Sequence, residues 1–254
     1  MSSVMHDTAI YISGLSVSFG GFAAITNLSM ELRYGEIRAI IGPNGAGKTT
    51  LMDVITGKTR PDQGAVYLVR EDKEQTLLTT MAEHEVAQLG IGRKFQRPTV
   101  FQGHSVFENI ELSLASKRGV FHSLFSLLRA EQRSKIDEIL SIVGLSERRG
   151  IRAGLLSHGE KQWLEIGMLL ALDPSILLVD EPIAGMTHQE TEKTAELLQS
   201  LAGKHTVVVV EHDMDFIRSI AKTVTVLHQG RVLAEGSMDK VQNDPKVIEV
   251  YLGE

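Results

Sequence analysis

The sequence predicts an α/β fold whose central sheet is mainly parallel. Residues 176–179 form an uninterrupted apolar run, and Thr206–Val210 is β-branched throughout. Continuous runs of this kind are typical of strands buried on both faces of a parallel sheet. A third, mostly apolar run, Ile37–Ile41, leads through a glycine-rich loop into a helical pattern that begins at Lys48. This alternation of strands and helices is the pattern of α/β proteins.

The elements of the first third are short. Strands are expected at residues 9–12, 16–19, 28–32, Ile37–Ile41 and 64–69. A helix is expected at residues 48–56, where Gly57 provides a stop signal and Pro61 follows shortly after. The mixed charge run at residues 70–74 is predicted to be a solvated turn.

Helical patterns dominate the middle of the chain. They extend over residues 106–143, within which the segment 120–128 is amphipathic. Such a segment can lie on a lipid surface, but we favour the alternative, a packing face of a helical subdomain. Helix continues over residues 164–172 until Pro174 breaks it. Residues 223–227 and 231–234 are predicted to form a hairpin around Gln229 and Gly230.

The composition excludes several classes of function. The chain has 254 residues, of which 43% are hydrophobic, enough for one globular domain with a subdomain. Its net charge of −6 argues against a domain that binds nucleic acid. The apolar runs are far shorter than the roughly 20 residues that span a bilayer, and no signal-peptide pattern opens the chain. Since the chain has no cysteine, it has no disulfide or thiolate chemistry, and we expect a cytoplasmic protein.

A phosphate-binding loop lies between a predicted strand and a predicted helix. Residues 42–49 read Gly-Pro-Asn-Gly-Ala-Gly-Lys-Thr, a G-x-x-x-x-G-K-[ST] match in the structural context that makes it credible. Backbone N–H groups can surround phosphates here, the Lys48 ammonium can reach the β and γ phosphates, and the Thr49 hydroxyl can bind Mg²⁺. The predicted nucleotide-binding residues of this segment are Gly42, Asn44, Gly45, Gly47, Lys48, Thr49 and Thr50.

Two acids, Asp180 and Glu181, follow the apolar run 176–179. The carboxyl end of a strand is where open α/β sheets bind their ligands. One carboxylate suits a Mg²⁺ shell, and the other can orient and polarise an attacking water.

Residues 156–160, Leu-Ser-His-Gly-Glu, lie between the phosphate loop and the two acids. Together the three motifs resemble the ATP-binding subunits of ABC transporters, whose signature is most often LSGGQ. The resemblance extends from about Ile10 to the end of the chain. It implies a P-loop NTPase (ABC ATPase) core with a mainly parallel sheet, an N-terminal antiparallel β subdomain and an inserted α-helical subdomain. The whole chain, residues 1–254, would be one ATP-binding domain, with the helical and signature subdomain at about 97–172 and a C-terminal hairpin and tail at 229–254.

The resemblance also implies roles for single residues. Asp180 would bind Mg²⁺, and Glu181 would be the catalytic base, assisted by Lys48. His212 stands at the place of the family's switch histidine, which contacts the γ-phosphate. Gln96 matches the glutamine that joins Mg²⁺ and water to the transmembrane partner. Phe19 stands where an aromatic ring, more often that of Tyr, stacks on adenine.

The implied partners are other protein subunits. In this family each ATP is sandwiched between the phosphate loop of one subunit and the signature of another, here Ser157, His158 and Gly159. Hydrolysis of ATP with Mg²⁺ would therefore need a head-to-tail homodimer or a heterodimer with a paralogue. Transmembrane permease subunits would hold the protein at the inner face of the cell membrane, and a solute-binding protein would act indirectly.

Within the family, residues 90–98 and the final Tyr-Leu-Gly-Glu are similar to ATPases of branched-chain amino acid and urea importers. Residues 162–168 and 180–187 favour the urea branch. The predicted function is therefore to power import of urea or short amides; the alternatives are a branched-chain amino acid importer and, less favoured, a non-transport ABC ATPase. Three positions depart from the family pattern: His158 replaces Gly, Glu160 replaces Gln, and Thr187 replaces Asp.

Overall fold

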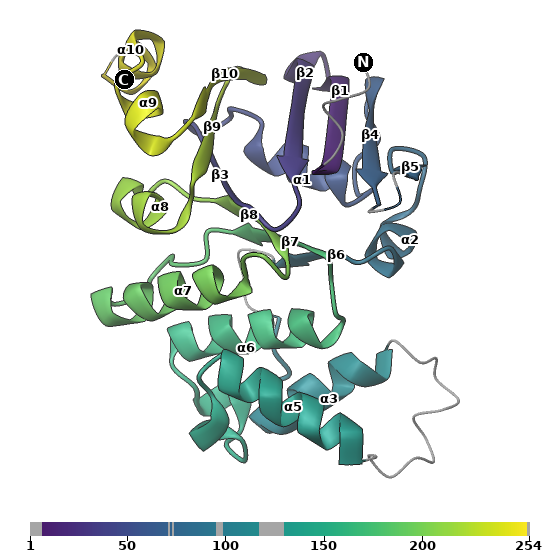
Figure 1. Cartoon of the computed structure of the whole chain (residues 1–254), viewed down its shortest axis with the longest axis vertical. Helices are drawn as coiled ribbons and strands as arrows, with labels where there is room; N and C mark the ends of the chain where they lie inside the picture. The colour runs from purple at the N-terminus through teal and green to yellow at the C-terminus, as the bar shows by residue number, and fades with distance from the viewer. Residues whose placement is uncertain (1–6, 71, 73, 95–98, 117–129, 253–254) are drawn as a thin grey trace.

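Figure 1 shows the computed structural model of the chain, which describes residues 7–70, 72, 74–94, 99–116 and 130–252. In this view the β-sheets lie in the upper part and a group of helices in the lower part. Gln96 and the amphipathic segment 120–128 lie outside the described residues, so their roles stay predictions. Within the described part, none of the helices combines the length and the apolar character needed to cross a bilayer.

Within the described residues, the larger sheet has six strands. Their order across the sheet is β10 (Arg231–Gly236), β9 (Thr223–His228), β3 (Ile37–Ile41), β8 (Thr206–Val210), β7 (Ile176–Asp180) and β6 (Ile91–Lys94). The strands from β9 to β6 pair in parallel, and β10 is antiparallel to β9. The predicted mainly parallel sheet is confirmed. Because parallel strands end at one edge of a sheet, the segments that follow β3, β7 and β8 meet there.

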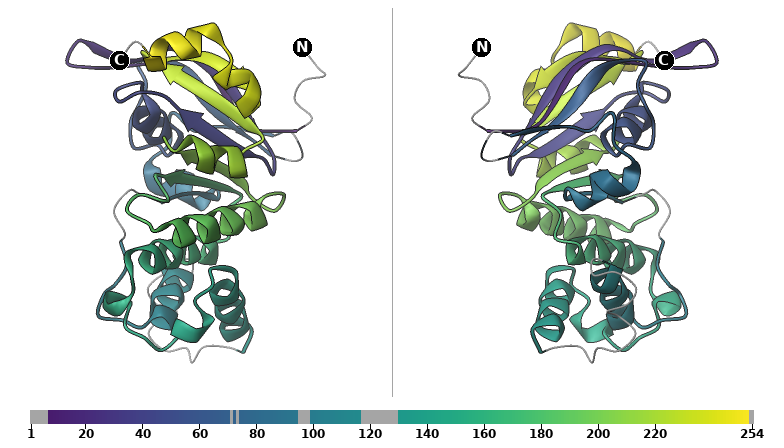
Figure 2. Two further views of the ribbon diagram at one scale, coloured as in Figure 1. Left: turned by 90° about the vertical axis from the view of Figure 1, so that its left-hand side faces the viewer. Right: turned by 90° about the vertical axis from the view of Figure 1, so that its right-hand side faces the viewer.

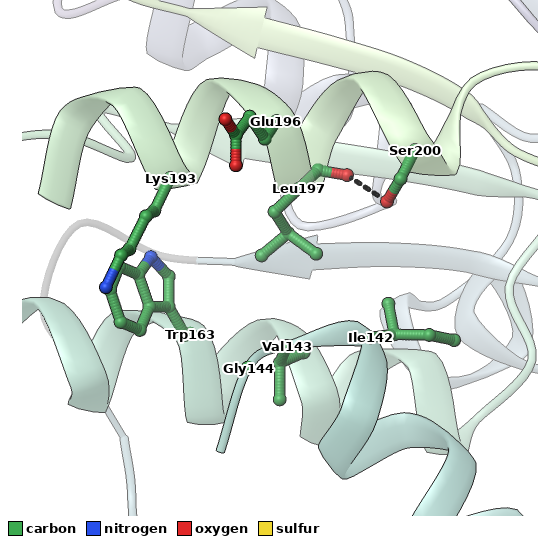
Figure 3. Close-up of a pocket in the computed structure, with 8 residues that line it drawn as sticks. All are labelled: Ile142, Val143, Gly144, Trp163, Lys193, Glu196, Leu197 and Ser200. Carbon is green, nitrogen blue, oxygen red and sulfur yellow. Dashed lines mark hydrogen bonds between the residues drawn. The ribbon is translucent and has the colours of Figure 1, made fainter. Parts of the chain in front are cut away.

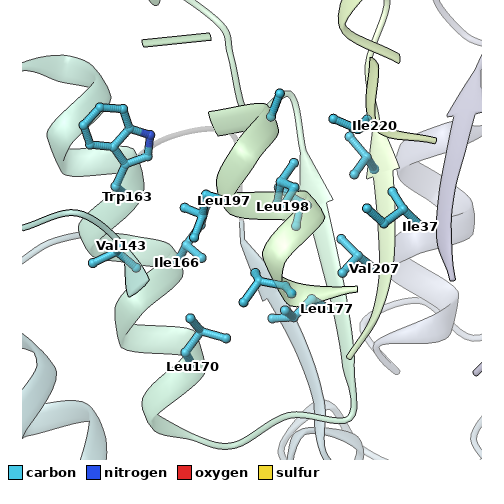
Figure 4. Close-up of a cluster of buried hydrophobic side chains, with 14 of the residues drawn as sticks. Ile37, Val143, Trp163, Ile166, Leu170, Leu177, Leu197, Leu198, Val207 and Ile220 are labelled. Carbon is cyan, nitrogen blue, oxygen red and sulfur yellow. The ribbon is translucent and has the colours of Figure 1, made fainter. Parts of the chain in front are cut away.

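The central strands are buried on both faces, as their apolar sequences predict. Ala39, Leu177 and Val207 belong to one hydrophobic cluster, whereas Ile40 and Leu178 belong to a second cluster on the other face. Alternation of this kind follows from the two-residue period of a strand. Figure 4 shows part of the first cluster, where strand side chains meet those of the neighbouring helices.

The smaller sheet is antiparallel, which confirms the N-terminal β subdomain. Its order is β2 (Phe22–Arg33), β1 (Thr8–Phe19), β4 (Gln63–Val69) and β5 (Gln75–Leu77). β1 is a single strand where two, at residues 9–12 and 16–19, are predicted. Gly14 lies between these two parts with a φ of 58°, and the register with β2 shifts there. The glycine therefore marks a bulge in the strand rather than its end.

Helices cover the first cluster. In Figure 1 α3 (Val106–Ser116), α5 (Ala130–Ile142) and α6 (His158–Ala171) form the lower layer, and α7 (His188–Leu201) lies between α6 and the larger sheet. Figure 2 shows the same layers from two sides. The other helices of the described part are α1 (Lys48–Ile55), α2 (Glu83–Gln88), α8 (Met214–Ile220), α9 (Met238–Gln242) and α10 (Pro245–Leu252). The predicted α-helical subdomain is present, and its boundaries at about 97 and 172 stay a prediction.

Candidate nucleotide site

The phosphate loop, residues 42–47, joins β3 to α1 and is held by neighbouring backbone. A Cβ atom at Gly47 would lie 2.7 Å from the carbonyl oxygen of Ala24, and one at Gly42 would clash with the carbonyl oxygen of Leu227. Gly47 also has a φ of 100° and immediately precedes α1. Only glycine satisfies both the conformation and the close approach. The loop is thus fixed between β2 and β9, with the amino end of α1 directed at the space where an anion can bind.

The Lys48 ammonium folds back onto this loop. Its Nζ atom donates to the carbonyl oxygens of Gly42 at 2.5 Å and Pro43 at 3.0 Å. Burial lowers the pKa of Lys48, while the charges of Glu181 and Asp180 raise it. An anionic ligand beside the loop would raise the pKa of Lys48 in the same way as these carboxylates and would favour its charged form.

A cavity of about 340 Å³ brings most of the predicted nucleotide-binding residues together. Its lining includes Phe19, Phe22, Ala24, Asn44, Gly45, Ala46, Gly47, Lys48, Thr49, Thr50, Asp180, Glu181 and Val210. Phe19 and Phe22 expose 52% and 66% of their surfaces, so both rings are open to a ligand at one end of the cavity. Phe22 was not predicted; its position next to two glycines after Phe19 is the only sequence signal.

Asp180 is held by an ion-pair cluster that the sequence does not reveal. Nη2 of Arg93 lies 3.4 Å from Oδ2 of Asp180, and Nη1 of the same guanidinium contacts Asp53 on α1. Burial raises the pKa of Asp180, and the Arg93 guanidinium opposes this rise. Arg93 thus joins the helix of the phosphate loop to the end of β7 and favours the ionised form of Asp180.

The donor set suits Mg²⁺. Thr49 and Asp180 line the same cavity and offer a hydroxyl and a carboxylate oxygen, the ligand type that Mg²⁺ prefers. In the part of the chain that the structure describes, no cluster of three or more His, Cys, Asp or Glu residues could hold a metal. Two protein oxygens are nevertheless sufficient for Mg²⁺, because this ion commonly completes its shell with phosphate oxygens and water.

Glu181 has an unusual backbone conformation. Its φ is 45°, and its N–H donates to the carbonyl oxygen of Val210 at 2.9 Å. A left-handed conformation of a non-glycine residue costs free energy and is common at functional sites. The hydrogen bond to β8 stabilises this turn, which places Glu181 in the lining of the cavity.

Glu211 is a buried acid whose role the sequence does not reveal. Its side chain accepts hydrogen bonds from the N–H groups of His212, at 2.9 Å, and Ile183, at 3.3 Å. Burial raises the pKa of Glu211, and these hydrogen bonds lower it. Glu211 therefore joins the segment after Glu181 to the segment that carries His212. The His212 side chain is 77% exposed and does not line the cavity.

The signature residues lie at a separate position on the chain. Ser157 caps α6, His158 begins that helix, and Gly159 is buried beside them. None of the three lines the 340 Å³ cavity. His158 directs Nε2 at the carbonyl oxygen of Ala184, 3.1 Å away. Thr187 caps α7 by accepting from the N–H of Glu190 at 3.3 Å, which gives this unusual residue a structural role that Asp also fills well.

A further cavity of about 410 Å³ lies between the end of α5 and helices α6 and α7 (Figure 3). Lys193 lies over the ring of Trp163, and the remaining lining is Ile142, Val143, Gly144, Glu196, Leu197 and Ser200. No predicted site residue borders it, so we assign the nucleotide chemistry to the smaller cavity beside the phosphate loop.

Comparisons with known proteins match most of the chain. The family described as "ABC transporter" matches residues 25–184, and the one described as "Branched-chain amino acid ATP-binding cassette transporter" matches residues 231–254. The chain is 35% identical, over 98% of its length and 100% of the relative, to the high-affinity branched-chain amino acid transport ATP-binding protein LivG of Salmonella typhimurium. The crystal structure of the ADP conformation of MJ1267, an ATP-binding cassette of an ABC transporter, superposes with a TM-score of 0.85 at 31% identity, covering 97% of this chain and 99% of that one. The dimeric structure of MJ0796, a bacterial ABC transporter cassette, has a TM-score of 0.75 at 27% identity, covering 90% of this chain and 98% of that one.

Proposed function

Because the chain belongs to the ATP-binding subunits of ABC transporters, we propose that it powers the import of branched-chain amino acids. The chain is an ATPase coupled to transport; the proposal concerns the solute, the site residues and the partners. The observation that carries the choice of solute is the C-terminal match at residues 231–254 to the branched-chain amino acid family, together with the full-length similarity to LivG. These findings favour a branched-chain amino acid importer over the urea or amide importer that the motifs alone suggest.

The proposed reaction is transfer of the γ-phosphoryl group of ATP to water. The backbone N–H groups of residues 44–47 and the Lys48 ammonium hold the phosphates, while Phe19 and Phe22 offer ring faces to the adenine. Glu181 accepts a proton from water as the water oxygen bonds to the γ-phosphorus and the bond to the β-phosphate oxygen breaks. Mg²⁺, held by Thr49 and Asp180, would neutralise charge on the phosphates.

Two further residues are assigned roles in this site by the family resemblance. His212 is the γ-phosphate sensor, and its 77% exposed side chain is able to turn towards a ligand. Gln96 joins the metal and water to the membrane partner. Both roles are part of the proposal.

A single chain does not complete this site. Since Ser157, His158 and Gly159 do not line the cavity of their own chain, we assign them to the nucleotide of a second subunit, packed head to tail. The dimeric MJ0796 cassette is consistent with such an assembly.

The exposed ring of Phe101 is our candidate contact for a permease subunit. Phe101 exposes half of its surface and precedes α3. Phe107, on α3, is instead half-buried, with the Arg149 guanidinium 4.3 Å from its ring centroid. Aromatic side chains are frequent anchors at protein interfaces. This contact would place the chain at the inner face of the membrane.

The solute is tested by uptake in the source cells. Replacing the chain by its Glu181→Gln variant should abolish uptake of labelled leucine, isoleucine and valine and leave urea uptake unchanged. Glu192→Gln, which alters an exposed glutamate on α7, is the matched control and should support normal uptake. Loss of urea uptake with retention of leucine uptake would reverse the choice of solute without affecting the ATPase function.

A further inference from the structure

The Ser157 hydroxyl is engaged within its own chain. Its single proton is donated to Oε1 of Glu190, on α7, at 3.0 Å, and its oxygen accepts from the N–H of Glu160 at 3.1 Å. A hydroxyl group has only one proton to donate. The bond to Glu190 therefore uses the donor that the proposed sandwich requires for the γ-phosphate of a partner's ATP.

Glu190 is held firmly in this position. Its Oε2 atom accepts from the N–H and the hydroxyl of Thr187, both at 2.9 Å. The backbone hydrogen bond from Thr187 is the largest cause of a lowered pKa for Glu190, and the Ser157 hydroxyl lowers it further. The carboxylate is accordingly ionised near neutral pH. It is an anion fixed at the amino end of α6, where the helix favours negative charge.

Gly159 provides the space for this carboxylate. A Cβ atom at Gly159 would lie 2.6 Å from Oε1 of Glu190. Its φ is not among the positive values of this chain, so conformational freedom is not the reason for glycine here. The contact that a side chain would prevent is the approach of Glu190 to the first turn of α6.

We propose that Glu190 is a positioning residue that competes with the partner's ATP for the signature. Its carboxylate holds the Ser157 hydroxyl in the separate subunit and must release it when the γ-phosphate arrives. The inference rests on the proposed sandwich and adds a residue that sets how readily the sandwich forms. Because two anions cannot share one donor without repulsion, Glu190 raises the concentration of ATP-loaded subunit needed for dimerisation.

The neighbouring side chains of Glu160 and His158 do not accept the proton of the Ser157 hydroxyl in place of Glu190. Glu160 is turned away from the Ser157 hydroxyl: it accepts from the Ser157 N–H at 2.9 Å and from Nε of Arg148 at 3.0 Å. The His158 ring is directed at Ala184 and Gln162. Of the side chains of Glu160, His158 and Glu190, that of Glu190 is the one that accepts the proton of the Ser157 hydroxyl.

The test compares Glu190→Gln with its parent in a Glu181→Gln background, which slows hydrolysis. Glutamine can still cap α7 as the third residue of a capping box, so the fold should be retained, as helix content by circular dichroism can verify. With saturating Mg²⁺-ATP, sedimentation should show a dimer dissociation constant about tenfold lower or more, since two like-charge contacts are removed per dimer. ATP affinity of the monomer should be unchanged.

Glu192→Gln is the control, because Glu192 lies on the same helix and its exposed side chain pairs with His188, at 3.4 Å, rather than with the Ser157 hydroxyl. It should leave the dimer constant unchanged. If Glu181→Gln dimerises and Glu190→Gln does not strengthen the dimer, Glu190 does not compete with ATP, although the proposed function stands. If Glu181→Gln itself stays monomeric with ATP, the proposed ATP-sandwich dimer and the competing role of Glu190 are both overturned.

Discussion

Gly47 is a residue of the phosphate loop that tolerates little change. Any side chain there meets the Ala24 carbonyl oxygen at 2.7 Å and must adopt a φ of 100°. The left-handed conformation alone costs roughly 1–2 kcal/mol, and the clash displaces the loop. Gly47→Ala should therefore weaken ATP binding by about tenfold or more, measured by calorimetry. Gly203→Ala is the control: its φ is 85°, but nothing lies within 4 Å of the added carbon, so ATP affinity should not change.

The single guanidinium of Arg93 joins Asp53 to Asp180. All three side chains are largely buried, and removal of one member of a buried ionic group typically costs about 3 to 5 kcal/mol. Arg93→Ala should lower the free energy of unfolding by about that amount and should raise the pKa of Asp180 further, because burial then acts unopposed by this cation. Urea denaturation measures the first effect. Arg33→Ala, which removes a side chain that is 65% exposed, should change stability by less than about 0.5 kcal/mol; an equal loss in both variants would contradict the role of Arg93.

The residues that touch the proposed nucleotide are largely readable from the sequence, because they come from contiguous motifs with fixed spacing. The buried charged residues that hold these site residues in place cannot be predicted from the sequence. Arg93, Asp53 and Glu211 come from separate segments, and a charged residue beside a strand is normally taken as solvated. Only the tertiary packing that buries these side chains assigns them their partners.

At the scale of elements, the Glu165 side chain connects α6 to the end of β6 and to Thr99, which follows that strand. Its Oε1 atom accepts from the N–H of Thr99 at 3.2 Å and from the Thr99 hydroxyl at 2.9 Å, and its Oε2 atom lies 3.7 Å from Nζ of Lys94. Lys94 is fully buried. The signature helix α6 is therefore anchored to Lys94 and to Thr99.

Glu165→Ala would deprive the buried Lys94 ammonium of this carboxylate and leave the Thr99 donors without their acceptor. We expect the free energy of unfolding to fall by about 3 to 5 kcal/mol, measured by chemical denaturation. Glu165→Gln keeps an acceptor for Thr99 and should cost less. If Glu165→Ala were as stable as the parent, the proposed tie between α6 and the β6 segment would be wrong.

The sequence predicts the long apolar strands well and the short polar elements poorly, for physical reasons. The runs of β3, β7 and β8 are apolar because both faces are buried, so their pattern is clear. β6 was missed because its four residues include glycine, arginine and lysine, and it is a strand only through pairing with β7. β5 and α2 are likewise short and polar, so their sequences alone do not distinguish them from loops.

At the scale of the whole molecule, the two halves of the proposed site are built on different layers. The phosphate loop and Glu181 follow strands of the larger sheet and Asp180 ends one, whereas Ser157 caps α6, a helix of the lower layer in Figure 1. The family resemblance predicted this separation; the described cavity, which excludes Ser157, is consistent with it. The proposed ATP site therefore depends on a second subunit that completes it.

Sedimentation of the Glu181→Gln variant with and without Mg²⁺-ATP tests this claim most directly. We expect a monomer without nucleotide and a dimer with it, because loss of the catalytic carboxylate slows hydrolysis by about 100- to 10,000-fold while ATP binding persists. Adding Ser157→Arg to the same chain should keep ATP bound and abolish the dimer. A Glu181→Gln subunit that binds ATP and remains monomeric, or a Ser157→Arg variant that dimerises as well as its parent, would contradict the composite site.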